Sequence, residues 1–150
     1  KQAGVNRVLL PSTTPAATLH ELSRARVEVE IENIAMSGEA VTQLLLQSRQ
    51  ENYSIAAAFN PLHFAQMGEL PFLQTYQKKI RRFVRTLIIN DGLATGKRTA
   101  LECGLAEIKE LISILSCASF DGLFLLESES PEMFGETVEK FYTMLEELRL

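Results

Sequence analysis

Five short apolar segments recur along the chain and predict the strands of a sheet. Each contains at least four apolar or β-branched residues over a strand-sized length and ends on polar residues. They cover residues 7–12, 27–33, 53–60, 85–91 and 122–128. Four of the five are apolar nearly throughout, which is typical of strands whose two faces are both covered.

Apolar residues at helical spacing lie between these segments and predict helices. Thr14-Pro15 has the cap-then-proline order of a helix start, and Ser37 precedes a second helix. The stripes are Val41, Leu44 and Leu45; Phe72, Tyr76 and Ile80; Leu105, Ile108, Ile112 and Leu115; and Phe134, Val138, Phe141, Leu145 and Leu148. Because parallel strands need a crossover that a helix supplies, this strict alternation predicts a parallel α/β fold.

One predicted strand departs from the apolar pattern. In residues 27–33, Glu28, Glu30 and Glu32 alternate with apolar residues, so three carboxylates lie on one face. A carboxylate face is unfavourable inside a doubly covered sheet unless it lines a wet or occupied cavity. The alternative is an edge strand with one solvated side, and the pattern alone leaves both interpretations open.

The length of the chain limits the architecture. Its 150 residues include 46% hydrophobic and 23% charged residues, enough for one domain with a hydrophobic core. We find no linker or internal repeat, so residues 1–150 are predicted to form a single domain. A closed eight-fold β/α barrel takes roughly 250 residues. Five β/α units would therefore make a partial barrel.

Composition narrows the class of protein. No run approaches the ~18 apolar residues of a membrane span, and the start lacks the basic-then-apolar layout of a secretory signal. Cys103 and Cys117 lack the spacing of a zinc site and are expected to be reduced thiols in a cytoplasmic protein. The net charge of −4 argues against a nucleic-acid partner.

The stretch "LIINDGLATGKRT", residues 87–99, contains the glycines and lysine of a phosphate-binding loop but not the spacing between them. A Walker loop needs Gly, four residues and then Gly-Lys-Ser/Thr. Here three residues separate Gly92 from Gly96, and Arg98 stands between Lys97 and Thr99. Lys97 and Arg98 can still meet an anionic substrate at the end of a strand, and a solvated loop is the alternative explanation.

The polar ends of four strands, taken in order, resemble a known family. They are "IEN" at 31–33, "FNPLHF" at 59–64, "LIINDG" at 87–92 and "LLES" at 125–128. The order resembles the second half of the xylose-isomerase-like TIM-barrel superfamily, which holds sugar phosphate isomerases, epimerases and apurinic endonucleases. The resemblance spans nearly the whole chain. It implies a parallel (β/α) barrel of the TIM type, here with about five units that match strands four to eight.

The resemblance also implies a divalent metal, Mn²⁺ or Mg²⁺, bound by Glu, Asp, His and Glu from successive strand ends. Glu32 and Glu127 stand in the two glutamate places, Asn60 in the aspartate place and Ile88 in the histidine place. An amide oxygen is neutral and isoleucine offers no donor atom. We therefore expect metal binding to be weakened or lost.

The same match suggests roles for individual residues. His63 stands where the sugar epimerases contact a substrate hydroxyl, and we place it with Asn60, Lys97 and Arg98 among the substrate-binding residues. Buried glutamates without a metal are expected to have raised pKa values, which suits general acid–base catalysis. Glu32 and Glu127 are thus the predicted catalytic pair of an isomerase or epimerase acting on a small sugar or sugar phosphate.

Two alternatives concern function and partners. One alternative is a catalytically inactive binding or assembly module that keeps the barrel scaffold. The endonuclease branch is disfavoured, because the dense basic run at 78–85 is explained by a solvated helix end. A partial barrel leaves parallel edges that tend to pair. We expect self-association or pairing with a missing N-terminal half.

Overall fold

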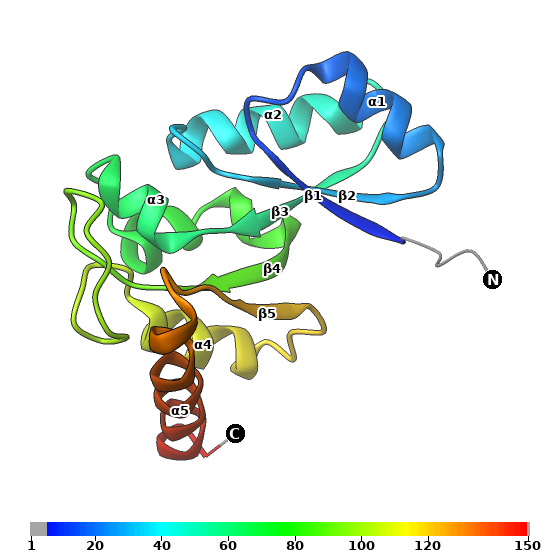
Figure 1. Cartoon of the computed structure of the whole chain (residues 1–150). Helices are drawn as coiled ribbons and strands as arrows, with labels where there is room; N and C mark the ends of the chain where they lie inside the picture. The colour runs from blue at the N-terminus through cyan, green and yellow to red at the C-terminus, as the bar shows by residue number, and fades with distance from the viewer. Residues whose placement is uncertain (1–5, 150) are drawn as a thin grey trace.

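The five predicted strands form one parallel sheet whose strand order follows the chain. The structure is a computed structural model that describes residues 6–149. The strands are β1 (Arg7–Pro11), β2 (Glu28–Glu32), β3 (Ile55–Phe59), β4 (Val84–Ile89) and β5 (Leu123–Leu126). Each pairs in parallel with the next. Figure 1 shows the sheet curling into an open half-barrel with helices outside it, which confirms the predicted fold class.

The helices lie between the strands, as the alternation predicts. They are α1 (Ala16–Arg24), α2 (Gly38–Gln50), α3 (Pro61–Gln66), α4 (Ile108–Cys117) and α5 (Pro131–Glu147). Ser37 accepts a capping hydrogen bond at the start of α2, as expected. The prediction for Thr14 was wrong, because its backbone amide closes a turn onto Pro11 and Pro15 takes the cap position of α1.

The predicted stripe at 72–80 does not form one continuous helix. A π-helical segment covers Pro71–Tyr76 and a 3-10 helix covers Lys79–Phe83. Lys78, between them, has an extended backbone, which interrupts the helical hydrogen bonds. Tyr76 and Ile80 are still buried. The stripe therefore predicted the burial of these side chains correctly and the single continuous helix wrongly. No helix within residues 6–149 combines the length and the hydropathy needed to cross a bilayer.

The hydrophobic core lies between the outer face of the sheet and the helices. Val29, Ile31, Phe59, Leu87 and Ile89 project outward into it and are almost fully buried. Because side chains alternate along a strand, the neighbouring positions project onto the concave inner face. That inner face carries Glu30 on β2, Ala56 and Ala58 on β3, Thr86 and Ile88 on β4, and Leu123 and Leu125 on β5.

The glutamates of β2 lie on this inner face, so the edge-strand interpretation is wrong. β2 is paired on both sides, with β1 and with β3. Arg7, on the neighbouring strand, lies 2.9 Å from Glu28 and 3.1 Å from Glu30. Burial raises the pKa of the Glu30 carboxyl, an effect that Thr86 and Arg7 partly offset. The interior of the half-barrel therefore contains an ion pair between β1 and β2.

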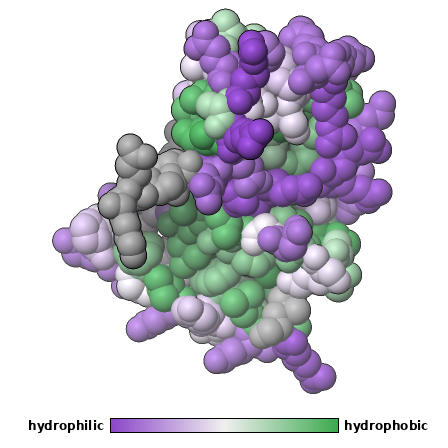
Figure 2. Space-filling model, turned by 90° about the vertical axis from the view of Figure 1, so that its right-hand side faces the viewer, coloured by the Kyte–Doolittle hydropathy of each residue, from purple (hydrophilic) through white to green (hydrophobic). Residues whose placement is uncertain are grey.

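The rest of the inner face is apolar and open. Figure 2 shows a hollow of hydrophobic surface framed by hydrophilic residues. Leu9, Leu123 and Leu125 lie on inward-facing positions, and their exposed fractions are 38%, 52% and 44%. In the part of the chain that the structure describes, β1 and β5 each pair on one side only. The half-barrel thus presents an apolar face and two free strand edges.

Candidate functional site

Polar side chains meet where four neighbouring strands end. Glu32 is the last residue of β2, Asn60 follows β3, Asn90 follows β4 and Glu127 follows β5. The carboxyl ends of parallel strands lie at one edge of a sheet, and this edge is where α/β barrels carry their active sites. The backbone amide of Glu127 donates to the carbonyl of Ile89 over 3.1 Å, which sets the height of β5 against β4. We call this edge the rim.

On one side of the rim, Asn60 and His63 contact Glu32. The Asn60 side-chain amide donates to Glu32 Oε1 over 2.7 Å. His63 Nδ1 lies 3.3 Å from the same oxygen, close enough for an ion pair when the imidazole is protonated. The local sequence explains this placement, because Asn60 caps α3, Pro61 begins it, and the Asn60 Oδ1 accepts from the His63 backbone amide.

A buried asparagine fixes the backbone beneath this group. Asn33 is 1% exposed, and its side chain donates to the Asn60 carbonyl over 3.0 Å. Its Oδ1 accepts from the Asn60 backbone amide over 2.8 Å. These two bonds connect the ends of β2 and β3. Asn60 is therefore held in position by Asn33, whose side-chain oxygen and nitrogen both have hydrogen-bond partners.

On the other side of the rim, Asn90 and Arg98 contact Glu127. The Asn90 side-chain amide donates to Glu127 Oε2 over 2.6 Å, and Arg98 Nη2 donates to the same oxygen over 2.8 Å. Burial pushes the pKa of the Glu127 carboxyl upward, but Asn90, Arg98 and the field of His63 outweigh it and lower the pKa. The expectation of a raised pKa was therefore wrong for Glu127. This carboxylate is ionised at neutral pH and suits a base.

Arg98 reaches Glu127 from a loop that Asp91 organises. The buried carboxylate of Asp91 accepts hydrogen bonds from the backbone amides of Gly92, Gly104 and Ala106. A Cβ atom at Gly104 would collide with the Asp91 carboxylate and the Gly92 backbone, which explains a glycine there. Gly92 and Arg98 also form an isolated antiparallel bridge. Arg98 is thus carried on a loop that several internal hydrogen bonds hold in place.

The remaining predicted site residues lie elsewhere. Ile88 is buried one layer below the rim, in register with Leu125. Lys97 is exposed, and within residues 6–149 no hydrogen bond or ion pair joins its side chain to either glutamate, so its role stays a prediction. The sequence analysis missed Asn90 as a site residue. The signal for it was its position two residues beyond Ile88, on the same face of the strand.

The donor set at the rim, as arranged, does not fit a divalent cation. Asn60 turns its NH₂ group toward Glu32 and uses its oxygen to cap α3. Glu127 Oε2 already receives two donors, one of them permanently charged. Within the described residues, no group of three or more His, Cys, Asp or Glu side chains is placed to hold a metal ion.

A small cavity lies beside Glu127. Asn90, Arg98 and Thr99 line it, and its volume of about 10 Å³ is roughly that needed by one water molecule. Three atoms of these residues are buried without a hydrogen-bond partner, namely Asn90 Oδ1, Arg98 Nη1 and Thr99 Oγ1. Buried polar atoms usually have partners. These atoms therefore offer one donor and two acceptors to a small polar group.

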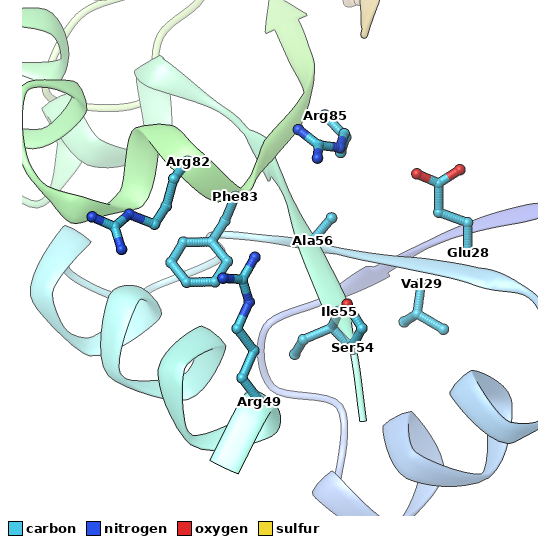
Figure 3. A pocket seen from close by; sticks show the side chains of 9 residues that line it. All are labelled: Glu28, Val29, Arg49, Ser54, Ile55, Ala56, Arg82, Phe83 and Arg85. Atoms are coloured by element: carbon cyan, nitrogen blue, oxygen red, sulfur yellow. The ribbon is translucent and has the colours of Figure 1, made fainter. Parts of the chain in front are cut away.

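A second pocket lies at the opposite end of the strands and does not belong to this site. Figure 3 shows the Arg49 guanidinium beside the aromatic ring of Phe83, with Arg82 and Arg85 among the other residues that line the pocket. The centre of that guanidinium is 4.3 Å from the ring centroid. Phe83 and Arg85 flank the first residue of β4, so this pocket is at the amino ends of the strands, away from the rim.

Comparison with known proteins identifies the fold. No protein-family model and no curated protein sequence matches the chain. A xylose isomerase domain protein from Planctomyces limnophilus matches with a TM-score of 0.69 and 16% identity, over 96% of this chain and 58% of that chain. A D-tagatose 3-epimerase-like protein matches with a TM-score of 0.69 and 13% identity, over 89% of this chain and 52% of that chain.

A third solved structure gives the same result. A xylose isomerase domain containing protein from Salmonella typhimurium matches with a TM-score of 0.65 and 13% identity, over 97% of this chain and 64% of that chain. The chain therefore spans 52–64% of the length of these three proteins. It has the fold of the xylose-isomerase-like TIM barrels over five of the β/α units.

Proposed function

We propose that this protein acts as a sugar isomerase or epimerase. It binds a small sugar or sugar phosphate at the rim and transfers a proton by acid–base chemistry. The observation that carries the proposal is the pair of rim carboxylates, Glu32 and Glu127, each held by its own donors. Two carboxyl groups in different environments are a common arrangement for proton transfer. The names of the matching solved structures, which include an epimerase-like protein, support the same class.

Glu127 is the proposed base. Its lowered pKa keeps it ionised, so it can accept the proton from a carbon next to the carbonyl group of a ketose. The electron pair of that C–H bond forms a double bond to the carbonyl carbon, and the carbonyl π electrons move to the oxygen. The resulting enediolate oxygen is stabilised by neighbouring donors. A second proton is delivered to the opposite face of the same carbon from Glu32 and His63, whose Oε1 and Nδ1 atoms lie 3.3 Å apart. The product is the epimer, and solvent restores the two carboxyl groups.

We further propose that this chemistry does not depend on a divalent metal. The support is chemical, because one oxygen of each rim carboxylate already accepts from N–H donors and Ile88 contributes no ligand. Calorimetric titration with Mn²⁺ tests the point. Weak or absent binding is expected, and tight one-to-one binding would restore a metal-dependent enzyme.

Deuterium exchange tests the proton transfer itself. In D₂O, we expect exchange of the C3 proton of a ketohexose, followed by NMR, and loss of that exchange in Glu127→Gln. Glu146→Gln is the control, because Glu146 is an exposed glutamate near the end of α5 and does not line the cavity beside Glu127. Equal exchange in wild type and Glu127→Gln would contradict the role of this carboxylate.

The alternative is a catalytically inactive binding or assembly module. The ion pair between Arg98 and Glu127, 2.8 Å long, favours it, because a neutralised carboxylate is a weak base. The module would bind sugars without exchanging protons. Saturable sugar binding, detected by NMR shifts, with no exchange for any sugar would favour the module over the enzyme.

The free edges and the apolar inner face support association. Further barrel strands, from an N-terminal portion of the same protein or from a second copy, would cover Leu9, Leu123 and Leu125. Sedimentation of the 150-residue chain should reveal self-association, unless an N-terminal partner is supplied. We place the protein in the cytoplasm, where its two exposed free cysteines would stay reduced.

A further inference from the structure

We propose that the Arg98 guanidinium performs the electrostatic task of a metal ion at this rim and binds the substrate oxygen that becomes negatively charged. The inference rests on the proposed function and adds to it a specific electrophile. The ligand class that it implies is an α-hydroxy ketone, bound through its carbonyl oxygen.

The first support is the position of the charge. Arg98 Nη2 lies 2.8 Å from Glu127 Oε2, so its positive charge lies against the carboxylate that a cation at this rim would contact. Asn90 donates to the same oxygen over 2.6 Å, so no lone pair remains in a free direction. A guanidinium group is protonated at every pH in the physiological range. A permanent positive charge is therefore present at Glu127 without any metal.

The second support is the unused donor of the same group. Arg98 Nη1 is buried without a partner, and Asn90 Oδ1 and Thr99 Oγ1 are in the same condition. All three residues line the small cavity beside Glu127. A donor at Arg98 matches a carbonyl oxygen, and an acceptor at Asn90 matches the adjacent hydroxyl. The cavity has room for about one oxygen atom and its hydrogens, rather than for a whole sugar.

The third support is that the charge is held in place before a substrate arrives. On each side of Arg98, the loop is bonded to itself: Leu93 N donates to the Lys97 carbonyl over 2.8 Å, and Thr99 N donates to the Asp91 carbonyl over 3.1 Å. The Asp91 carboxylate anchors the loop with three further bonds. Charges fixed in advance stabilise a developing oxyanion better than mobile ones.

Competition with Mn²⁺ tests the inference without relying on activity. Mn²⁺ binding is measured by calorimetry for wild type, Arg98→Ala, the double variant Arg98→Ala/Glu127→Gln, and Arg82→Ala as a control arginine far from the rim. We expect Arg98→Ala to bind Mn²⁺ at least about tenfold more tightly than wild type, and the double variant to lose this gain. Arg82→Ala should match wild type. Equal Mn²⁺ affinity in wild type and Arg98→Ala would overturn the inference.

Chemical rescue tests the catalytic part. Arg98→Ala should lose proton exchange by about 100-fold, the effect of removing one oxyanion donor, and added guanidinium ion should restore part of it. Unchanged exchange in Arg98→Ala would overturn the inference while leaving the proposed function intact. If wild type exchanges no proton, the proposed function fails, and the Mn²⁺ comparison still decides whether Arg98 occupies the cation position. Circular dichroism checks that each variant is folded.

Discussion

Asn60 donates its side-chain amide to Glu32 over 2.7 Å, so a hydrogen-bond donor stands at the position where the sequence motif predicts an aspartate. The same asparagine caps α3 through its oxygen and so positions His63. Asn60 therefore positions both Glu32 and His63, and replacing it tests how this side of the rim is held together.

Asn60→Asp should bring a second carboxylate against Glu32. Aspartate caps helices as well as asparagine does, so α3 should persist. Two carboxylates at hydrogen-bond distance repel each other, so we expect a lower melting temperature at pH 7 than at pH 5. Added Mn²⁺ should restore the melting temperature at pH 7 by binding the pair. Asn60→Ser, which keeps a cap without a charge, is the control. An unchanged response to Mn²⁺ and pH would contradict this account of Asn60.

Arg7→Met should destabilise the protein by leaving Glu30 without its cationic partner. The expected loss is about 1–3 kcal/mol at pH 7. Because burial raises the pKa of Glu30 in the folded state, the folded protein binds a proton more readily than the unfolded chain. The stability of the protein therefore falls as the pH rises from the pKa of the unfolded state toward the pKa of the folded state. The defect should therefore shrink at acidic pH. Urea unfolding of Arg7→Met and Glu30→Gln across pH 4–7 measures it; a pH-independent defect would count against the pairing.

Glu102 connects the loop that carries Arg98 to the last two long helices. It lies 3.2 Å from Lys109 on α4 and 2.6 Å from Lys140 on α5. The hydrogen bond from Lys140, opposed by slight burial and aided by Lys109, lowers the pKa of Glu102. The stabilisation that Glu102 contributes is present above its pKa in the unfolded state. It is lost as the pH falls through its pKa in the folded state.

Glu102→Gln should therefore reduce stability at pH 7 and have no effect at low pH. Solvent screens these exposed pairs, so the expected loss is below about 1 kcal/mol. Thermal unfolding at pH 7 and pH 3, in low and high salt, measures it. Glu110→Gln, on α4 but outside the network, is the control. An equal loss at both pH values would refute the electrostatic origin.

Two glycines should respond in opposite ways to alanine. Gly104→Ala would force Asp91 and the Gly92 backbone apart, and we expect a loss of about 1–3 kcal/mol. Gly135 lies inside α5 with nothing within 4 Å of an added Cβ, so Gly135→Ala should gain about 0.5–1 kcal/mol from helix propensity. Chemical denaturation compares the two. Similar effects of both changes would contradict the tight packing of the loop around Asp91.

The alternation of apolar segments was sufficient to predict the sheet, because parallel strands and crossover helices leave a distinct pattern in a sequence. It was also sufficient to predict that Glu32, Asn60 and Glu127 lie at strand ends. It did not predict the partner of Glu30, because Arg7 reaches that carboxylate only through the register of β1 against β2. Contacts of this kind depend on three-dimensional alignment, which residue types alone do not specify.

The direction of the pKa shift of Glu127 could not be predicted from the sequence either. Burial alone raises the pKa of a carboxyl, and the sequence indicated burial. The donors that reverse the shift, Asn90 and Arg98, lie 37 and 29 residues away from Glu127 along the chain. The motif also puts its ligand position at Ile88 and not at Asn90, the polar residue at the end of the same strand.

Proton exchange in the presence of a chelator tests the central claim most directly. Wild-type protein is incubated with a ketohexose in D₂O containing excess EDTA, and loss of the C3 proton signal is followed by NMR. We predict that exchange proceeds at the same rate with and without EDTA and is abolished in Glu127→Gln. Exchange that stops in EDTA and returns with Mn²⁺ would contradict a rim that works through Arg98 in place of a metal ion.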